Sequence, residues 1–175
     1  MKVLVIGLGQ LGRDLVRVFG VSDTVIGFDV PDVDITSSAS VEGLLDEHAP
    51  ELVINAAAYT DVEGAESNRE AAYAVNDAGA GVVAAAAAER GLPVVHYSTD
   101  FVFDGRKGAP YVPEDVTNPL SVYGASKLAG EVAVIDGNAR HYVLRTAWLY
   151  GPGGNNFVEK IIGWARSNDS IRVVT

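Results

Sequence analysis

"VLVIGLGQLGRDLV", residues 3–16, is the stretch of sequence that decides the fold. It begins with apolar, largely β-branched residues, continues with three glycines in the pattern GxGxxG, and ends in a hydrophobic pattern of helical period. In a strand–turn–helix unit, these glycines allow a tight turn, a close approach of the backbone to a pyrophosphate, and close packing of helix on strand. The stretch therefore predicts a dinucleotide-binding turn, the alternative being a plain glycine-rich turn. The residues assigned to it are Gly7, Gly9, Gln10, Leu11 and Gly12.

Short apolar runs alternate along the chain with longer stretches of helical period. The predicted strands are 2–6, 24–28, 52–55, 93–98, 141–146 and 171–174. The predicted helices are 10–19, 38–48, 69–89, 121–136 and 155–167. Such alternation favours a parallel sheet with right-handed crossovers. We predict an α/β fold, a doubly wound parallel sheet of the Rossmann type, formed by residues 1–175 as one dinucleotide-binding domain.

The composition excludes several classes of function. The chain has 175 residues, a formal net charge of −10 and no cysteine. So acidic a surface disfavours a nucleic-acid partner, and the lack of cysteine excludes disulfides and fits a reducing compartment. The apolar runs are too short for a signal peptide or a membrane span. Since His48, His96 and His141 lack metal-ligand spacing, we expect a cytoplasmic protein without a metal site.

Asp29 ends the second predicted strand, downstream of the glycines. A carboxylate at this position accepts hydrogen bonds from the adenosine ribose and repels a 2′-phosphate, which favours NAD(H) over NADP(H) as the cofactor. The alternative is a cap or turn residue. Asp34 and Ile35 follow in the next loop and are expected to frame the adenine, unless Asp34 only forms an Asx turn.

The third predicted strand ends in Asn55, which is followed by Ala56, Ala57 and Ala58. In open α/β sheets the ligand lies beyond the carboxyl ends of the strands, and small residues there leave room for it. We therefore place these four residues in the cofactor site. The alternative is that the alanines serve helix packing.

Ser98 and Thr99 end the fourth predicted strand, where a hydroxyl can hydrogen-bond a substrate carbonyl. Tyr123 and Lys127 follow at i, i+4 spacing, so that their side chains share one face of a helix. A nearby ammonium would lower the pKa of the phenol, which could then protonate a carbonyl oxygen as a hydride reaches the carbon. The Lys can also reach the cofactor ribose. Taken singly, such a Tyr more often packs a core, and a strand-end Ser-Thr pair more often caps a turn.

A glycine turn, a hydroxyl after the fourth strand and Tyr-x-x-x-Lys, in this order, resemble the extended branch of the short-chain dehydrogenase/reductase superfamily. The motifs that narrow the resemblance are "GQLG", "NAAAYT", "AES", "STDFVFDG", "NPLSVYGASKLAGE" and "RTAWLYG". Together they resemble the dTDP-4-dehydrorhamnose reductase family along the whole chain. The resemblance implies reduction of the 4-keto group of a dTDP-linked 6-deoxyhexulose to dTDP-L-rhamnose, with NADPH or NADH.

The resemblance also assigns roles to single residues. It makes Thr99 the catalytic hydroxyl, Tyr123 the proton donor and Lys127 the residue that holds the cofactor. Further residues belong to the run after the hydroxyl and to the "RTxWxYG" signature beside the active site. The implied substrate-binding residues are Thr99, Asp100, Phe101, Tyr123, Arg145 and Trp148.

Three features depart from the family pattern. The glycine turn is one residue shorter than the usual GxxGxxG, which changes the expected geometry at the pyrophosphate. Glu63 stands where the family usually has Asp. The family continues well beyond "IRVVT", so we expect the C-terminal substrate domain to be largely absent from this chain.

Other readings stay open from the sequence. Some proteins of this fold bind NADP(H) without catalysis and serve as regulatory subunits, as in methionine adenosyltransferase. Nucleotide-sugar epimerases and dehydratases use similar residues, although dehydratases usually carry an acidic pair after the hydroxyl, and here Asp100 is followed by Phe101. Helices 69–89 and 121–136 could pair two copies in a homodimer. Segment 103–120, with three Pro and two Gly, is expected to be an irregular and functional loop.

Overall fold

The protein is described by a computed structural model that covers residues 1–152 and 156–172. Five parallel strands form one sheet in the order β2-β1-β3-β4-β5. They are β1 (Lys2–Ile6), β2 (Thr24–Phe28), β3 (Leu52–Asn55), β4 (Val94–Thr99) and β5 (His141–Thr146). The predicted parallel sheet is confirmed, and these five strands begin and end within one residue of their predicted bounds.

Strand β1 lies in the interior of the sheet, with β2 on one side and β3 on the other. Its residues Val3, Leu4, Val5 and Ile6 are fully buried. Because successive side chains of a strand point to opposite faces, Leu4 and Ile6 join one core cluster, and Val3 and Val5 join another. Both faces of β1 are therefore covered, which explains its unbroken apolar sequence.

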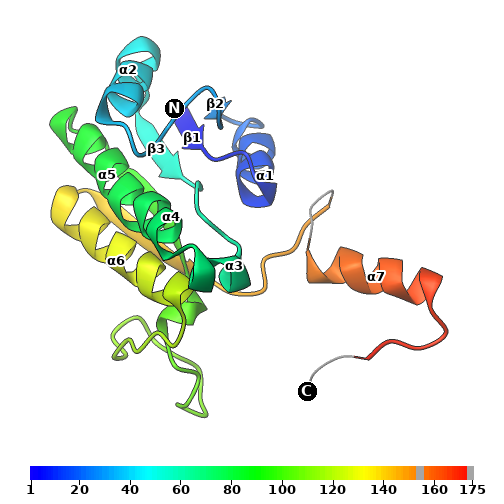
Figure 1. Ribbon diagram of the computed structural model, residues 1–175. Coiled ribbons are helices and arrows are strands. Elements are labelled where there is room, and N and C mark those ends of the chain that lie inside the picture. The colour runs from blue at the N-terminus through cyan, green and yellow to red at the C-terminus, as the bar shows by residue number, and fades with distance from the viewer. Residues whose placement is uncertain (153–155, 173–175) are drawn as a thin grey trace.

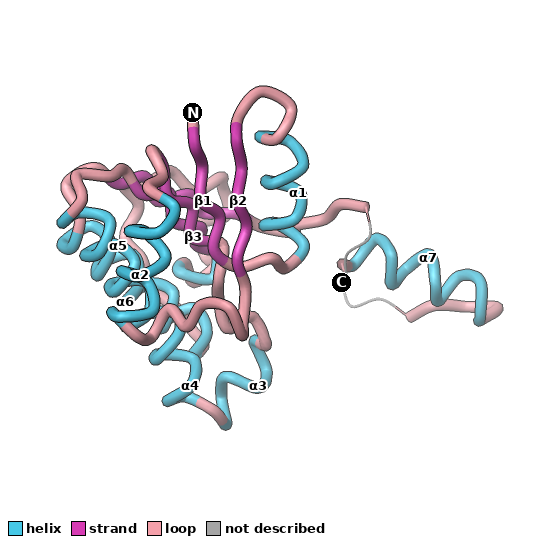
Figure 2. Tube along the Cα trace, turned by 90° about the horizontal axis from the view of Figure 1, so that it is seen from above, coloured by secondary structure: helices cyan, strands magenta, loops and turns pink. Residues whose placement is uncertain are grey.

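Helices cover the two faces of the sheet (Figure 1). Helix α1 (Gln10–Phe19) packs on one face, where its apolar side chains meet Val3 and Val5. Helices α2 (Ser38–His48), α5 (Ala80–Glu89) and α6 (Val122–Gly137) cover the opposite face. Figure 2 shows the same separation from above, with α1 beyond β2 and α2, α5 and α6 across the sheet. This is the doubly wound arrangement that the sequence predicts.

The predicted helix 69–89 is divided into three parts. It consists of α4 (Arg69–Tyr73), a π-helical turn (Ala74–Gly79) and α5. The side chain of Asn76, in the π turn, accepts a hydrogen bond from Tyr59 N at 2.8 Å and donates to Ser126 Oγ at 3.0 Å. The wider turn thus lets one buried amide join α6 to the loop that follows β3. Such π turns are often found near functional sites.

Three further elements differ from the prediction. Helix α3 (Val62–Ser67) is capped by Asp61, whose side chain accepts from Gly64 N, and it was not predicted. Helix α7 (Phe157–Ser167) begins inside the predicted range 155–167, of which residue 155 lies outside the described residues. Of the predicted strand 171–174, residues 171 and 172 are not in a strand, and 173 and 174 lie outside the described residues. Helix α7 projects away from the sheet (Figure 1).

Segment 103–120 is irregular, as predicted, and follows a 3-10 turn at Asp100–Val102. Tyr111 and Asn118 hold it together by donating hydrogen bonds to the carboxylate of Asp104 at 3.0 and 3.1 Å. Within the described ranges, the helices are too short or too polar to cross a membrane.

Candidate active site

The strand order reverses between β1 and β3, because the chain passes outward from β1 to β2 and then returns to β3 on the other side. In open α/β sheets, ligands bind in the crevice at such a switch point, beyond the carboxyl ends of the strands. A cavity of about 840 Å³ opens there. The predicted residues that line it are Gly7, Gly9, Gln10, Leu11, Gly12, Asp29, Asp34, Ile35, Ala56, Ala57, Ala58, Ser98, Thr99, Asp100, Phe101, Tyr123, Lys127 and Trp148. Asn55 and Arg145 are predicted site residues that do not line it.

The three glycines of the turn divide their roles as the motif predicts. Gly7 has a φ of +93°, and a Cβ there would lie 2.4 Å from the nitrogen of Ala57. A Cβ on Gly12 would lie 1.8 Å from the carbonyl oxygen of Gly7, so that α1 packs directly on the turn. A Cβ on Gly9 would meet no atom of the described residues within 4 Å. Gly7 and Gly12 are thus required by packing, whereas Gly9 leaves space open at the cavity.

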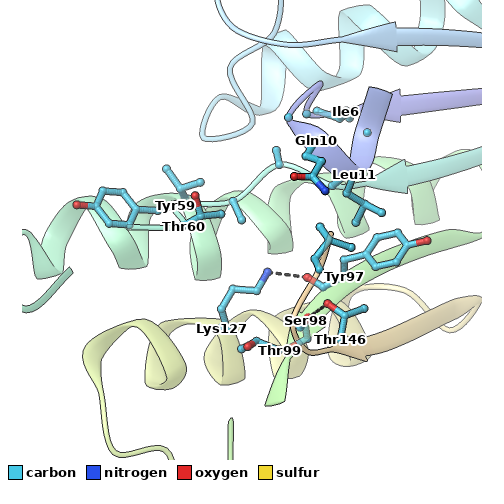
Figure 3. Close-up of a pocket in the computed structure, with 18 of the residues that line it drawn as sticks. Ile6, Gln10, Leu11, Tyr59, Thr60, Tyr97, Ser98, Thr99, Lys127 and Thr146 are labelled. Atoms are coloured by element: carbon cyan, nitrogen blue, oxygen red, sulfur yellow. Dashed lines mark hydrogen bonds between the residues drawn. The ribbon is translucent and has the colours of Figure 1, made fainter. Parts of the chain in front are cut away.

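Two buried polar atoms at the cavity, Ser98 Oγ and Gln10 Nε2, have no hydrogen-bond partner within the described part of the chain. Figure 3 shows both side chains at the cavity. Buried polar groups are nearly always paired, so both atoms are suited to form hydrogen bonds with a bound ligand. The N–H groups of the first turn of α1 also lack partners within the helix and carry partial positive charge. These features fit a nicotinamide dinucleotide, with its diphosphate at the start of α1.

Asp29 and Asp34 line the cavity and also make local hydrogen bonds. Asp29 accepts from Leu8 N at 3.0 Å and from Val30 N at 2.9 Å, so its carboxylate fastens the glycine turn to the end of β2. Asp34 accepts from the hydroxyl of Thr36 at 2.7 Å and from its N–H at 2.9 Å, which is the predicted alternative of an Asx turn. The bond from the Thr36 hydroxyl is the largest of the effects that lower the pKa of Asp34.

Arg145 lies behind the site rather than in it. Its Nε and Nη2 donate to the two carboxylate oxygens of buried Glu131 at 2.9 and 2.6 Å. Its Nη1 donates to the carbonyl oxygen of Pro113 at 3.3 Å, and its guanidinium lies 5.0 Å from the ring centroid of Phe103. Arg145 therefore fastens segment 103–120 to α6 and β5, and its implied role in substrate binding stays a prediction.

Tyr123 and Thr99 meet at the cavity. Tyr123 stands in the first turn of α6, which is capped by Ser121. Its ring meets Phe101 edge to face at a centroid distance of 5.6 Å. The hydroxyl of Thr99 accepts from Phe101 N and donates to Asp100 Oδ1, both at 3.2 Å. Burial raises the pKa of Tyr123 above its ordinary value, while a hydrogen bond with Thr99 acts in the opposite direction.

Lys127 extends from α6 to the cavity (Figure 3). Its Nζ donates to the main-chain oxygen of Tyr97 at 2.7 Å and lies 3.4 Å from His96 Nε2. Burial lowers the pKa of Lys127 to about 8, and nearby Glu131 acts in the opposite direction. The prediction that Lys127 lowers the pKa of Tyr123 is wrong for this structure. The pKa is raised, because burial of the phenol dominates and Lys127 bonds to β4.

Six polar or aromatic residues line the cavity that the sequence did not single out: Arg13, Thr36, Tyr59, Thr60, Tyr97 and Thr146. Arg13 directly follows the last glycine of the turn, so a basic side chain beside the predicted dinucleotide-binding turn can be recognised from the sequence. Thr146 donates from its hydroxyl to the main-chain oxygen of Ser98 at 3.3 Å (Figure 3). Tyr59 and Thr60 come from the irregular chain after β3, where spacing gives no signal.

A second cavity of about 360 Å³ adjoins the first and shares Asp100 and Phe101 with it. Phe103 and Tyr111 also line it, and their rings are stacked with centroids 4.1 Å apart. The site thus continues from the dinucleotide crevice to an aromatic wall provided by segment 103–120.

The switch-point cavity, the glycine turn and the converging Thr, Tyr and Lys side chains define a Rossmann-type domain of the short-chain dehydrogenase/reductase class. Residues 1–175 match the family model described as "RmlD substrate binding domain", and the chain belongs to that family. The family resemblance predicted from the motifs is therefore confirmed.

Named relatives agree with this assignment. A protein of Sinorhizobium fredii named dTDP-4-dehydrorhamnose reductase is 47% identical over 144 residues, which are 82% of this chain and 49% of the relative. The crystal structure of a dTDP-4-dehydrorhamnose reductase from Clostridium acetobutylicum superposes with a TM-score of 0.95 at 43% identity, over 99% of this chain and 62% of that one. The enzyme of the same name from Bacillus anthracis, in complex with NADP, gives a TM-score of 0.94 at 37% identity, over 97% and 61%. The chain therefore spans less than two thirds of the length of these relatives.

Proposed function

We propose that this chain carries the cofactor-binding and catalytic part of an NAD(P)H-dependent reductase that converts dTDP-4-dehydrorhamnose to dTDP-L-rhamnose. The observation that carries the proposal is that Thr99, Tyr123 and Lys127 line one cavity at the switch point of the sheet. Membership of the family, and relatives named for this reaction, support the choice of substrate.

The roles of the side chains follow from their chemistry. Reduced nicotinamide supplies a hydride to the carbonyl carbon, and the carbonyl oxygen must gain a proton for the ketone to become an alcohol. Tyr123 donates that proton, while the hydroxyl of Thr99 hydrogen-bonds the same oxygen. A tyrosine phenol keeps its proton in the neutral range, and burial, which raises the pKa of Tyr123, keeps it protonated there while making it a weaker acid.

The cofactor is NAD(H) or NADP(H), as supported by the NADP complex of the Bacillus anthracis relative and by the fit of the cavity. Between the two, we propose a preference for NADH. Asp29 lines the cavity and brings a negative charge to the end of β2, where it would repel a 2′-phosphate. Arg13 also lines the cavity and acts in the other direction, so the preference depends on which charge lies nearer the ribose.

Replacing Asp29 by Asn is expected to shift the ratio of NADPH to NADH affinity towards NADPH by about tenfold, since the charge is removed while the shape is kept. Fluorescence titration with both cofactors measures the ratio. Asp32→Asn is the matched control, because it removes the same charge from an exposed residue that does not line the cavity. An equal shift in both variants, or none in Asp29→Asn, would contradict the assignment of Asp29.

The proposed function is tested by incubating the protein with dTDP-4-dehydrorhamnose and NADH or NADPH, with loss of the reduced nicotinamide signal as the readout. We expect one dTDP-L-rhamnose to form for each cofactor oxidised. UDP-glucose and dTDP-glucose, which have no keto group, are the controls. Tight cofactor binding with no turnover of the keto sugar would count against a reductase and favour a binding role.

We also infer that residues 1–175 form a single dinucleotide-binding domain. The continuous five-stranded sheet, with core clusters on both faces, supports this. Two copies would pair through α5 and α6, as supported by the exposure of Val132 and Ile135 on α6. The dTDP-sugar would be the one small-molecule partner besides the cofactor, and the acidic net charge of −10 agrees with the absence of a nucleic-acid partner.

A further inference from the structure

Three polar side chains form a buried chain of contacts beneath the cavity. Asn55 ends β3, His96 lies in β4 and Lys127 lies on α6, and their exposed fractions are 1%, 1% and 2%. Asn55 Nδ2 lies 3.2 Å from His96 Nδ1, and His96 Nε2 lies 3.4 Å from Lys127 Nζ. At its ends the chain reaches Ala57 N, 3.1 Å from Asn55 Oδ1, and the main-chain oxygen of Tyr97, 2.7 Å from Lys127 Nζ.

Counting donors and acceptors places the protons on Asn55, His96 and Lys127. The N–H of Ala57 donates to Asn55 Oδ1, so the NH₂ group of Asn55 faces His96. His96 Nδ1 must then be an acceptor, and its ring proton lies on Nε2, because a neutral imidazole has one N–H. That N–H faces Lys127 Nζ. An ammonium has donors only, whereas a neutral amine can accept from His96 and still donate to Tyr97.

The surroundings keep the imidazole of His96 neutral and favour the neutral amine of Lys127 only in alkaline solution. Burial, and then the charge of Lys127, lower the pKa of His96 to about 3, so the imidazole stays neutral. Burial lowers the pKa of Lys127 to about 8. The carboxylate of Glu131, one helical turn away, would favour the ammonium, but Arg145 engages both of its oxygens. The other titratable side chains near these three residues are Tyr97 on β4, Asp100 after β4 and Tyr123 on α6.

We propose that Asn55 and His96 are positioning residues that couple the charge of Lys127 to the cofactor. In the cofactor-free protein they favour the neutral amine of Lys127, and a bound cofactor favours the ammonium, so that binding in alkaline solution adds a proton to Lys127. The inference rests on the proposed function, since it needs a dinucleotide in the cavity that Lys127 lines. The negative charge of the diphosphate and the ribose oxygens would favour the ammonium.

Charging Lys127 also changes the hydrogen bonds of His96 and Asn55. His96 Nε2 must then accept a hydrogen bond, so its proton moves to Nδ1. Asn55 can accept that proton only if its amide turns over, and the N–H of Ala57 loses its partner as a result. Ala57 lines the cavity beside Gly7, so the freed N–H becomes available there.

The pH range of the effect follows from the sign of the change. The pKa of Lys127 is about 8 in the free protein and would move towards its ordinary value of 10.5 when the cofactor binds. Proton uptake on binding is therefore small below the lower value, where Lys127 is already charged. It is largest between the two values, where only the bound form is charged.

Calorimetric titration of the protein with NADH, in buffers of different ionisation enthalpy, measures this uptake. We expect it to rise from near zero at about pH 6 to nearly one proton at about pH 9. His96→Leu removes the N–H that favours the neutral amine, so the rise should move upward by about one pH unit. His96→Gln, whose amide offers one acceptor and one donor, should restore the original profile. No uptake in the unmodified protein, or identical profiles for both variants, would overturn the proposal.

Nitrogen NMR of His96 tests the proton positions without any variant, with His48 and His141 as internal references. We expect the Nε2–H form at about pH 9 in the cofactor-free protein and the Nδ1–H form after saturation with NADH. An Nδ1–H form in the free protein would overturn the donor count. NADH binding without a change of tautomer would overturn the coupling alone, whereas a failure of both NADH and NADPH to bind would overturn the proposed function as well.

Discussion

Replacing Tyr123 by Phe is expected to lower turnover of the keto sugar by about 10²- to 10⁴-fold, the usual contribution of general acid catalysis, while NADH still binds. The variant keeps the ring and its edge-to-face contact with Phe101, so the fold around the first turn of α6 should be preserved. It removes the hydroxyl that Thr99 hydrogen-bonds and that supplies the proton. Oxidation of NADH in the presence of dTDP-4-dehydrorhamnose gives the rate, and fluorescence titration gives the affinity.

Tyr142→Phe is the matched control for this experiment. Tyr142 lies on β5 with 63% of its surface exposed, and it is not among the residues that line the cavity. Its loss of a hydroxyl should leave the rate unchanged. If Tyr123→Phe turned over as fast as Tyr142→Phe, Tyr123 would be a packing residue and the proton would come from elsewhere.

Replacing Gly12 by Ala is expected to reduce the free energy of unfolding by about 3 kcal/mol or more and to abolish cofactor binding. The added Cβ would lie 1.8 Å from the oxygen and 2.9 Å from the carbon of the Gly7 carbonyl. Both atoms belong to the backbone, so no change of rotamer can relieve the overlap, and α1 would have to move away from the turn. Urea unfolding measures the stability, and NADH titration measures the binding.

Gly9→Ala separates the effect of packing from that of the ligand. A Cβ there meets no atom of the described residues within 4 Å, so the cost should stay within about 1 kcal/mol, as for an Ala at a helix N-cap. Binding of NADH should still weaken, because the methyl group would occupy the open side of the turn. Equal stability of the two variants would show that α1 does not pack on the turn as closely as described.

The parts of the fold that were predictable are those where one local signal suffices. β1 is buried on both faces, and its apolar run is therefore uninterrupted from Val3 to Ile6. The glycines of the turn leave an equally direct mark, since no other residue can take the φ of +93° at Gly7 or the close contact at Gly12 without strain. These signals gave the sheet, its parallel direction and the position of the cavity.

The remaining elements depend on contacts between distant residues. The π turn at Ala74–Gly79 contains Asn76, whose partners Tyr59 and Ser126 lie 17 and 50 residues away. Helix α3 has six residues, too few to show a helical period. Periodicity alone gives no information on either feature.

The same limit applies to the chemistry of the site. The i, i+4 spacing correctly placed Tyr123 and Lys127 on one face of α6, but it does not tell how deeply either side chain is buried. Burial raises the pKa of Tyr123, and it lowers that of Lys127 to about 8. The contact of Lys127 with His96, 31 residues earlier, and that of Arg145 with Glu131 are also invisible to a search for motifs.

The position of β1 inside the sheet has a consequence for biosynthesis. The ribosome makes β1 before both strands that flank it, and β3, at Leu52–Asn55, comes only after β2 and α2. At about 5–20 residues per second, roughly several seconds pass between the synthesis of the apolar run Val3–Ile6 and that of β3, which pairs with it on one side. During this interval it is an unpaired, hydrophobic edge of the kind that associates with other chains. Nascent chains that stall between β2 and β3 should therefore be the ones that most need a chaperone.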